Sequence, residues 1–319
     1  MAMSDVQKAE LKAEKAYARK HKRMYRLTAG DVIFNVINYT IFALFTFACF
    51  FPFWYLFCNT VSDSDAVSKG IVKFFPKNFT FENYKNIITD STTLRAFFVT
   101  LSRTILGTAV MVLASALIGY LVTKKELWGR KVWYRLLVIT MYFNAGIIPW
   151  YMNMSMLGLT GNYLAYIIPG IVAPYNIILV KTYIESIPAE LEESAFIDGA
   201  SHMKIFRSII WPLCKPILAT IAIFGAVGNW NSFQDSLILM SNAPELHTLQ
   251  HKLYIYLTQI TSIGQNTGGV DVDPETVKKL SSQAVKYTVS MATLIPILIV
   301  YPFMQRYFEE GIMLGAVKG

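Results

Sequence analysis

The sequence predicts an all-α, polytopic membrane protein with six transmembrane helices. Hydrophobic residues make up 54% of the chain and charged residues only 16%, and the mean hydropathy is +0.40. A soluble domain usually carries about 25% charged residues. Lipid is therefore expected to cover much of the surface, and apolar stretches of helix-spanning length support the same class.

Six stretches approach the roughly 20 apolar residues that a membrane-crossing helix needs. They lie at about residues 33–57, 97–122, 132–151, 164–183, 212–233 and 288–308. Lys and Arg are frequent in the N-terminal segment and in the loops after the second and fourth stretches. The positive-inside rule then puts both termini and these loops in the cytoplasm.

The same pattern predicts the domain organisation. Residues 1–30 form a basic cytoplasmic arm, too polar for a signal peptide, and residues 31–319 form the transmembrane domain. Within that domain we expect a cytoplasmic loop at 185–215 and a long outer loop at 238–287. The net charge of +8 is attributed to topology and contact with lipid headgroups, not to nucleic acid.

Motifs for catalysis or for cofactor binding are absent from the sequence. It contains no phosphate-binding loop, no His-Glu-x-x-His motif and no nucleophile elbow. Cys49, Cys58 and Cys214 lack metal-site spacing, and His247 with His251 is interpreted as a solvated pair. We therefore expect a chain without catalytic residues, bound metal or cofactor of its own.

The loop between the fourth and fifth stretches, ELEESAFIDGASHMKIFRSIIWPLCKP (190–216), is unusually polar for its place. Three glutamates suit the start of a helix, Gly199 suits its left-handed end, and Ser201 can cap a second helix with Met203, Phe206 and Ile210 on one face. Pro212 is expected to open the fifth span. Two short helices at a sharp angle would fit a partner's groove; alternatively, they only pack against the inner ends of the spans.

This loop resembles the EAA loop of bacterial ABC-importer permeases. That pattern is Glu-Ala-Ala, three residues, Gly, nine residues, Ile, one residue, Leu-Pro. The chain has Glu193-Ser194-Ala195, then Gly199, then Ile209-Ile210-Trp211-Pro212 at matching spacing, with Ser194 and Trp211 as its two departures. The last segment, YPFMQRYFEEGIMLGAVKG (301–319), is also similar to the carbohydrate branch, most of all to permeases for polysaccharide fragments.

The resemblance implies a MetI-like permease fold and a multi-subunit machine in the bacterial cytoplasmic (inner) membrane. The implied partners are a second permease subunit, expected to be a different chain, two cytoplasmic ATPase subunits that bind ATP and Mg, and an external solute-binding protein. The EAA loop would be the helix that docks on the ATPase. The residues implied in this coupling are Glu193, Ser194, Ala195, Asp198, Gly199, Phe206 and Pro212.

Polar and aromatic groups in or near the spans are candidates for the path of the cargo, because amides exposed to lipid are costly. The residues so named are Arg103, Tyr142, Asn144, Tyr151, Tyr175, Asn229, Trp230, Asn231, Gln234 and Asp235. Asn231 and Gln234 share a helix face, which we expect to line the path. Bonding between helices is the alternative for the amides, and Arg103 either extends to headgroups or attracts an anionic cargo.

The leading function is translocation of oligosaccharides, acidic polysaccharide fragments among them, driven by ATP hydrolysis in partner subunits. One alternative is a permease of the same machinery for peptides or another solute. A second is an autonomous secondary transporter. Such transporters typically carry carboxylates inside the membrane, and Asp235 is the clear candidate here.

Overall fold

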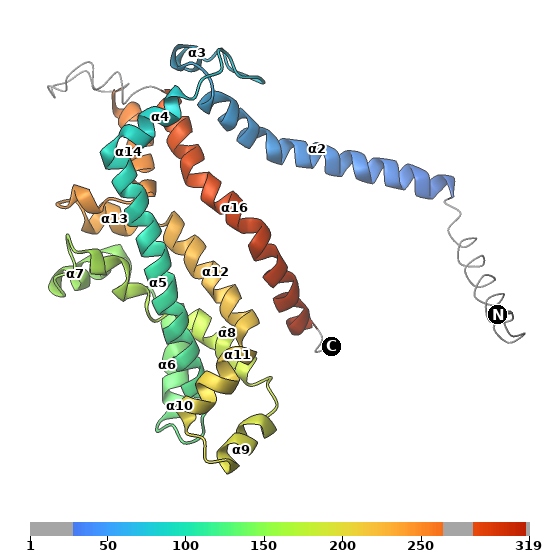
Figure 1. Ribbon diagram of the computed structural model, residues 1–319, viewed down its shortest axis with the longest axis vertical. Coiled ribbons are helices and arrows are strands. Elements are labelled where there is room, and N and C mark those ends of the chain that lie inside the picture. Colours follow the sequence, from blue (N-terminus) through green and yellow to red (C-terminus); the bar gives the residue numbers. More distant parts are fainter. Residues whose placement is uncertain (1–27, 264–282, 317–319) are drawn as a thin grey trace, which may run out of the picture. The chain divides into compact units, whose positions relative to one another are not determined.

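The computed structural model describes residues 28–263 and 283–316 (Figure 1). Residues 1–27 of the expected basic arm and residues 264–282 of the expected outer loop lie outside the described residues. The described part of the chain contains helices and turns and no strand, which confirms the all-α class. The chain divides into two units, residues 1–55 and 56–319.

Most of α2 (Ala29–Thr60) belongs to the first unit. Its start is a reciprocal cap: Thr28 N–H donates to Asp31 Oδ2 at 2.8 Å, and Asp31 N–H donates to Thr28 Oγ1 at 3.3 Å. The helix exposes aromatic side chains along its length; Phe34 and Phe45 are 67% and 66% exposed. An apolar surface of this kind suits lipid rather than water.

The second unit is built from short and long helices. The first of these are α3 (Ser64–Ser68), α4 (Glu82–Thr89) and the long helix α5 (Ser91–Thr123). The next are α6 (Arg130–Tyr142), α7 (Ile147–Met156), η1 (Tyr163–Tyr166), η2 (Ile168–Gly170), α8 (Pro174–Ile184), α9 (Glu190–Ile197), α10 (His202–Ile205), the π-helical η3 (Phe206–Ile210) and α11 (Trp211–Leu213). The last are α12 (Lys215–Asn231), α13 (Gln234–Leu239), η4 (Pro244–Leu246), α14 (Leu249–Ile263) and α16 (Gln283–Ala316).

Helix α5 is the longest element of this unit that lacks proline, and α8 and α12 pack along it (Figure 1). It starts where the Asp90 carboxylate accepts hydrogen bonds from the N–H groups of Thr92 and Thr93. Gly119 brings α5 close to α8: a Cβ added there would lie 3.0 Å from a methyl of Val180. The sequence of α5 thus combines a side-chain cap at its start, a helical backbone without proline, and a small residue where α5 contacts α8.

Three described helices are long and apolar enough to cross a membrane: α2, α5 and the part of α16 over Gln283–Pro302. Two bent pairs add one crossing each if each is counted as a single span. The first, Tyr163–Gly170 with Pro174–Ile184, bends by 42°, and the second, His202–Leu213 with Lys215–Asn231, bends by 79°. The number of crossings is thus three to five on these criteria, and the prediction of six is not confirmed.

Two local predictions differ from the structure. The expected third span at 132–151 is interrupted between α6 and α7, where Gly146 takes a positive φ of 87° and Asn144 Oδ1 accepts from its N–H at 2.9 Å. Pro212 does not open the fifth span. It lies in α11, ahead of the 79° bend, and Pro216 stands in the first turn of α12 instead.

A buried ion pair joins α5 to α13. Arg103 is 1% exposed, and its two terminal nitrogens donate to the two carboxylate oxygens of Asp235 at 3.2 and 2.7 Å. The Tyr166 ring centroid lies 4.4 Å from the guanidinium carbon. Arg103 therefore does not extend to headgroups, which corrects that expectation: a buried cation requires a counter-charge, and Asp235, whose side chain is 17% exposed, supplies it.

The expectation that His247 and His251 form a solvated pair is wrong for His251, whereas His247 is partly exposed. His251 is 3% exposed, its Nδ1 lies 2.9 Å from Ser236 Oγ, and its ring centroid is 4.1 Å from that of His247. Burial lowers the pKa of His251 to about 4, because a desolvated imidazole disfavours the charged form. The cluster ties α13 to α14 with both rings held close.

The ion pair makes a prediction about stability. Asp235→Ala leaves the Arg103 guanidinium buried without its counter-charge, and we expect it to cost about 3–5 kcal/mol, because an uncompensated buried charge is left behind. The double variant Arg103→Met/Asp235→Leu removes both charges and should melt closer to the wild type. Thermal unfolding in detergent, followed by intrinsic fluorescence, measures this. A single variant that melts with or above the double variant would contradict the prediction.

Candidate functional site

The polar loop forms a helical hairpin at the end of α5 remote from α4 and α14 (Figure 1). Helix α9 ends in a Schellman arrangement: Gly199 N–H donates to Phe196 O and Ala200 N–H to Ala195 O, each at 3.0 Å. Gly199 has a φ of 75°, as the sequence predicted. A Cβ added there would meet nothing within 4 Å, so the requirement for glycine lies in the backbone alone.

The two arms of the hairpin begin as the sequence predicted. Glu190, Glu192 and Glu193 lie in the first turn of α9, where their charges complement the helix dipole. Ser201 caps α10, with its hydroxyl oxygen accepting from Lys204 N–H at 3.4 Å. The chain then continues through the π-helical η3 into α11.

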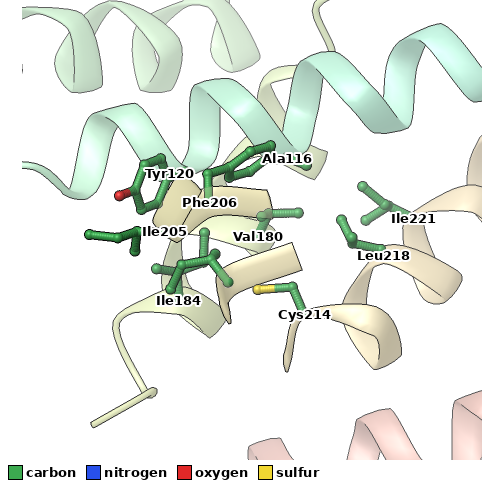
Figure 2. Close-up of a cluster of buried hydrophobic side chains, with 10 residues drawn as sticks. Ala116, Tyr120, Val180, Ile184, Ile205, Phe206, Cys214, Leu218 and Ile221 are labelled. Atoms are coloured by element: carbon green, nitrogen blue, oxygen red, sulfur yellow. The ribbon is translucent and has the colours of Figure 1, made fainter. Parts of the chain in front are cut away.

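The inner face of the hairpin is packed into an apolar cluster with α5, α8 and α12. Figure 2 shows Tyr120 and Ala116 of α5 against Phe206, with Ile205, Val180 and Ile184 beside them. The Tyr120 and Phe206 ring centroids are 5.4 Å apart. Ile210 is fully buried in the same cluster, whereas Met203, expected on this face, is 48% exposed.

The outer face of the hairpin exposes a second apolar set. Leu191, Phe196, Ile197 and Met203 are exposed, and Ile197, next to the glycine turn, is 87% exposed. An isolated exposed apolar residue is ordinary, but four on one short hairpin beside an acidic helix start are suited to a partner's groove. Among the described residues, the hairpin thus has one face packed within the chain and several apolar side chains exposed away from it.

The residues named for coupling differ in their exposure to solvent. The exposed ones are Glu193, Ser194, Asp198, Gly199 and Pro212. Ala195 is partly buried against the apolar cluster, and Phe206 is 8% exposed, between Tyr120 and Trp211. Phe206 therefore holds the hairpin to the spans and does not itself present a surface to a partner.

A cavity of about 230 Å³ lies between α5, α8 and α12, under the turn formed by η1 and η2. Its lining contains small residues, two aromatic rings, two amides and no charged side chain. The lining residues are Gly107, Met111, Tyr166, Ile167, Gly170, Ala173, Asn176, Phe224, Gly225, Gly228 and Asn229.

The two amides of the cavity are weakly held. Asn176 Nδ2 donates to the thioether sulfur of Met111 at 3.1 Å, and Asn229 Nδ2 donates to Thr108 Oγ1 at 3.4 Å. A thioether is a weak acceptor, and 3.4 Å is long for a hydrogen bond. Amides held this loosely can exchange such bonds for bonds to a ligand hydroxyl.

Among the residues named from the sequence for the cargo path, Asn229 lines this cavity and the others lie elsewhere in the described structure. Trp230 is 6% exposed and its Nε1–H donates to Thr293 O of α16 at 2.9 Å. Asn231 bonds to Val227 O of its own helix and to Gln250. The remaining members, Tyr142, Asn144, Tyr151, Tyr175 and Gln234, are exposed, while Arg103 and Asp235 form the buried ion pair.

Sequence reasoning missed several lining residues for identifiable reasons. Asn176 stands next to Tyr175, and because successive helix residues point about 100° apart, only the packing of α8 decides which one faces the cavity. Tyr166 sits in a 3-10 turn, where no helical periodicity is available. The glycines, by contrast, gave a usable signal: small residues at Gly225 and Gly228 of α12 mark a close approach or an open space.

The inner face of the hairpin and the lining of the cavity consist mainly of apolar, amide and glycine residues. Among the residues that the structure describes, no group of three or more His, Cys, Asp or Glu side chains could hold a metal ion. The geometry offers an amide-lined cavity inside the bundle, which reaches Met111 of α5, and a hairpin with exposed apolar side chains, which contacts α5 at Tyr120, about 2.5 turns further along.

Comparison with known proteins agrees with this arrangement. The family model described as "Binding-protein-dependent transport system inner membrane component" matches residues 17–314. Protein LplC of Bacillus subtilis is 34% identical over 93% of this chain and 98% of that protein. The polygalacturonan/rhamnogalacturonan transport system permease protein YtcP of the same organism is 31% identical over 90% of this chain and 99% of that protein.

A solved structure is similar in fold as well as in sequence. One chain of the crystal structure of a bacterial ABC transporter involved in the import of the acidic polysaccharide alginate superposes with a TM-score of 0.79 and 30% identity, covering 88% of this chain and 98% of that one. The match extends over nearly the whole length of each protein compared. The chain therefore belongs to the family of inner-membrane components of binding-protein-dependent transport systems, which are membrane-spanning permeases of ABC transporters.

Proposed function

We propose that this chain is a translocation subunit of an ATP-driven importer for oligosaccharides. The observation that carries the proposal is the hairpin at the end of α5, which is packed on its inner face and exposes Leu191, Phe196, Ile197 and Met203 on its outer face. The relatives named for polygalacturonan, rhamnogalacturonan and alginate transport support sugars as the cargo. Acidic polysaccharide fragments are one class within this proposal.

In this proposal the hairpin docks on a cytoplasmic ATPase subunit, and the chain itself hydrolyses nothing. Two ATPase subunits bind ATP and Mg, a second, different permease subunit completes the translocation path, and an extracytoplasmic solute-binding protein delivers the oligosaccharide. The termini and residues 185–215 lie in the cytoplasm, and the multi-pass bundle lies in the bacterial cytoplasmic membrane. The apolar face of α2 supports contact with lipid.

The cavity supports a sugar as the cargo by its chemistry. Two loosely held amides, a tyrosine and a phenylalanine match hydroxyl edges and the weakly apolar faces of sugar rings. Its volume of about 230 Å³ is small beside the roughly 300–1,000 Å³ of pockets that enclose a ligand. In this proposal the chain forms only one half of the path and a second permease subunit forms the other half, which explains the small volume of the cavity within this chain.

The alternatives have less support. An ion-coupled secondary transporter needs a carboxylate free to exchange its ion, and Asp235 is held by Arg103 at 2.7 Å. A permease for peptides would share the hairpin and the fold. A path for peptides needs charged side chains to bind the charged termini of the peptide. The lining of this cavity contains no charged side chain.

Orientation is the first prediction. In a chain lacking Cys49, a cysteine at Lys69 should react with an impermeant maleimide added to intact cells, because this exposed residue precedes α5 on the proposed outer side. Cysteines at Trp128 and Ser201, both exposed beyond the other end of α5, should react only after the membrane is opened. Labelling of Trp128→Cys or Ser201→Cys in sealed cells would overturn the orientation.

Docking of the hairpin is the second prediction. Gly199→Val should release the ATPase subunits during purification of the complex, since a β-branched residue at a φ of 75° costs at least about 1 kcal/mol. Ile197→Asp should do the same by placing a charge in the apolar contact. Gly199→Asn is the matched control, because asparagine tolerates the left-handed conformation, and it should retain the ATPase. Retention by all three variants would contradict a docking role.

The cavity gives the third prediction. Asn229→Leu should raise the apparent KM for oligosaccharide uptake about two- to tenfold, the equivalent of one hydrogen bond. Asn231→Leu is the control, because its amide bonds within α12 and to α14 and does not line the cavity. Uptake kinetics in proteoliposomes would distinguish them; equal KM values for both variants would argue against the cavity as the path.

A further inference from the structure

The last turn of α5 holds the first arm of the hairpin by a charged contact. Lys124, the C-cap residue of α5, forms an ion pair with Glu192 of α9. The two side chains are 14% and 16% exposed, so the pair is largely shielded from water. The Lys124 ammonium also lies 4.2 Å from the centroid of the Tyr120 ring, within cation–π range.

The same turn holds the second arm. Tyr120, one helical turn before Lys124, packs its ring against Phe206 of η3 at 5.4 Å between centroids, and Figure 2 shows the two rings next to each other. Arg130 donates to the carbonyl of Thr123 at 3.0 Å and thereby holds the end of α5. Two neighbouring positions of one helix therefore contact both arms of the hairpin.

Further along α5, towards its start, lie contacts at the cavity and beyond it. Gly107 and Met111 line the cavity, and Arg103 forms the buried ion pair with Asp235. The helix has 33 residues without a proline, a length of about 50 Å. A displacement applied at Lys124 thus reaches the cavity through one continuous helix.

The covalent routes from the hairpin are less direct. The second arm joins α12 only after a π-helical segment and a bend of 79° between Leu213 and Lys215. The first arm joins α8 through the turn at 185–189, whose Ser186 and Ile187 N–H groups bond to the end of α8. The ion pair of Lys124 with Glu192 links α9 directly to α5, which lines the cavity together with α8 and α12.

We propose that Lys124 is a positioning residue that, through Glu192, makes α5 follow the hairpin when the ATPase moves it. The inference rests on the proposed function, in which the hairpin is the docking element. Beyond the proposed function, the inference identifies the contact that transmits the motion of the hairpin to the cavity. Docking itself uses the outer face of the hairpin, so loss of the ion pair leaves the ATPase bound and weakens the connection between the hairpin and α5.

The chain contains a matched control with the same chemistry. Lys181 pairs with Glu185 at 2.8 Å, and its ammonium lies 4.6 Å from the Tyr134 ring centroid. This group repeats the combination of lysine, glutamate and tyrosine near the same end of the bundle. It connects α8 to the turn after it and to α6, and it does not include α9.

The experiment uses the complete transporter, with its binding protein, in proteoliposomes. The variants are Lys124→Met, Glu192→Gln, both together, Lys124→Arg, and the control Lys181→Met. Three quantities are measured: ATPase subunits retained, melting temperature, and sugar imported per ATP hydrolysed. Lys124→Met and Glu192→Gln should each lower import per ATP about fivefold or more, the size of a typical coupling between sites, with the ATPase retained.

The double variant should be no worse than either single variant, because both remove the same contact, and Lys124→Arg should restore import per ATP. Lys181→Met should match the wild type. Fully additive losses, equal losses in Lys124→Met and Lys181→Met, or a fall in melting temperature that accounts for the loss would each overturn the proposal. Release of the ATPase by Lys124→Met would also overturn it. Retention of the ATPase by Ile197→Asp would count against the proposed docking instead.

Discussion

Backbone hydrogen bonding in a water-free bilayer is the constraint on which this structure depends. Inside lipid every N–H and C=O must be paired within the protein, so a crossing segment is a helix or a helix whose breaks are covered. Helix α5 meets the requirement without interruption. The bent elements that include α8 and α12 pack along it, and their breaks place irregular backbone where side chains of α5 lie.

The same constraint explains where polar side chains are found. Arg103 is tolerated inside the bundle because Asp235 neutralises it, and Trp230 because Thr293 O accepts its N–H. Asn176 and Asn229 differ from these because their partners are a thioether and a distant hydroxyl. Firmly paired groups hold helices together, and loosely paired groups remain on the wall of the cavity that we propose for the cargo.

The two faces of the hairpin follow from one short sequence. Residues that point inward, such as Ile205, Phe206 and Ile210, join the cluster with α5 and α12, while Ile197 and Met203 remain exposed. Gly199 makes this possible, since its left-handed backbone turns α9 back towards α10. This packing supports the docking role that we propose, because a hairpin held firmly against the spans transmits a displacement better than a flexible loop does.

The all-α class, the membrane setting and the glycine-turned hairpin could be predicted from the sequence, because hydropathy, capping residues and the conformational range of glycine act locally. The EAA spacing likewise marked the loop that we propose for coupling. Tertiary structure decided the rest. Whether Tyr175 or Asn176 faces the cavity depends on how α8 rotates against α5, and Arg103 meets Asp235 only because residues 132 positions apart are brought together. Hydropathy measures the polarity of a segment, whereas the partner of a polar group is fixed by packing, and local sequence does not contain that information.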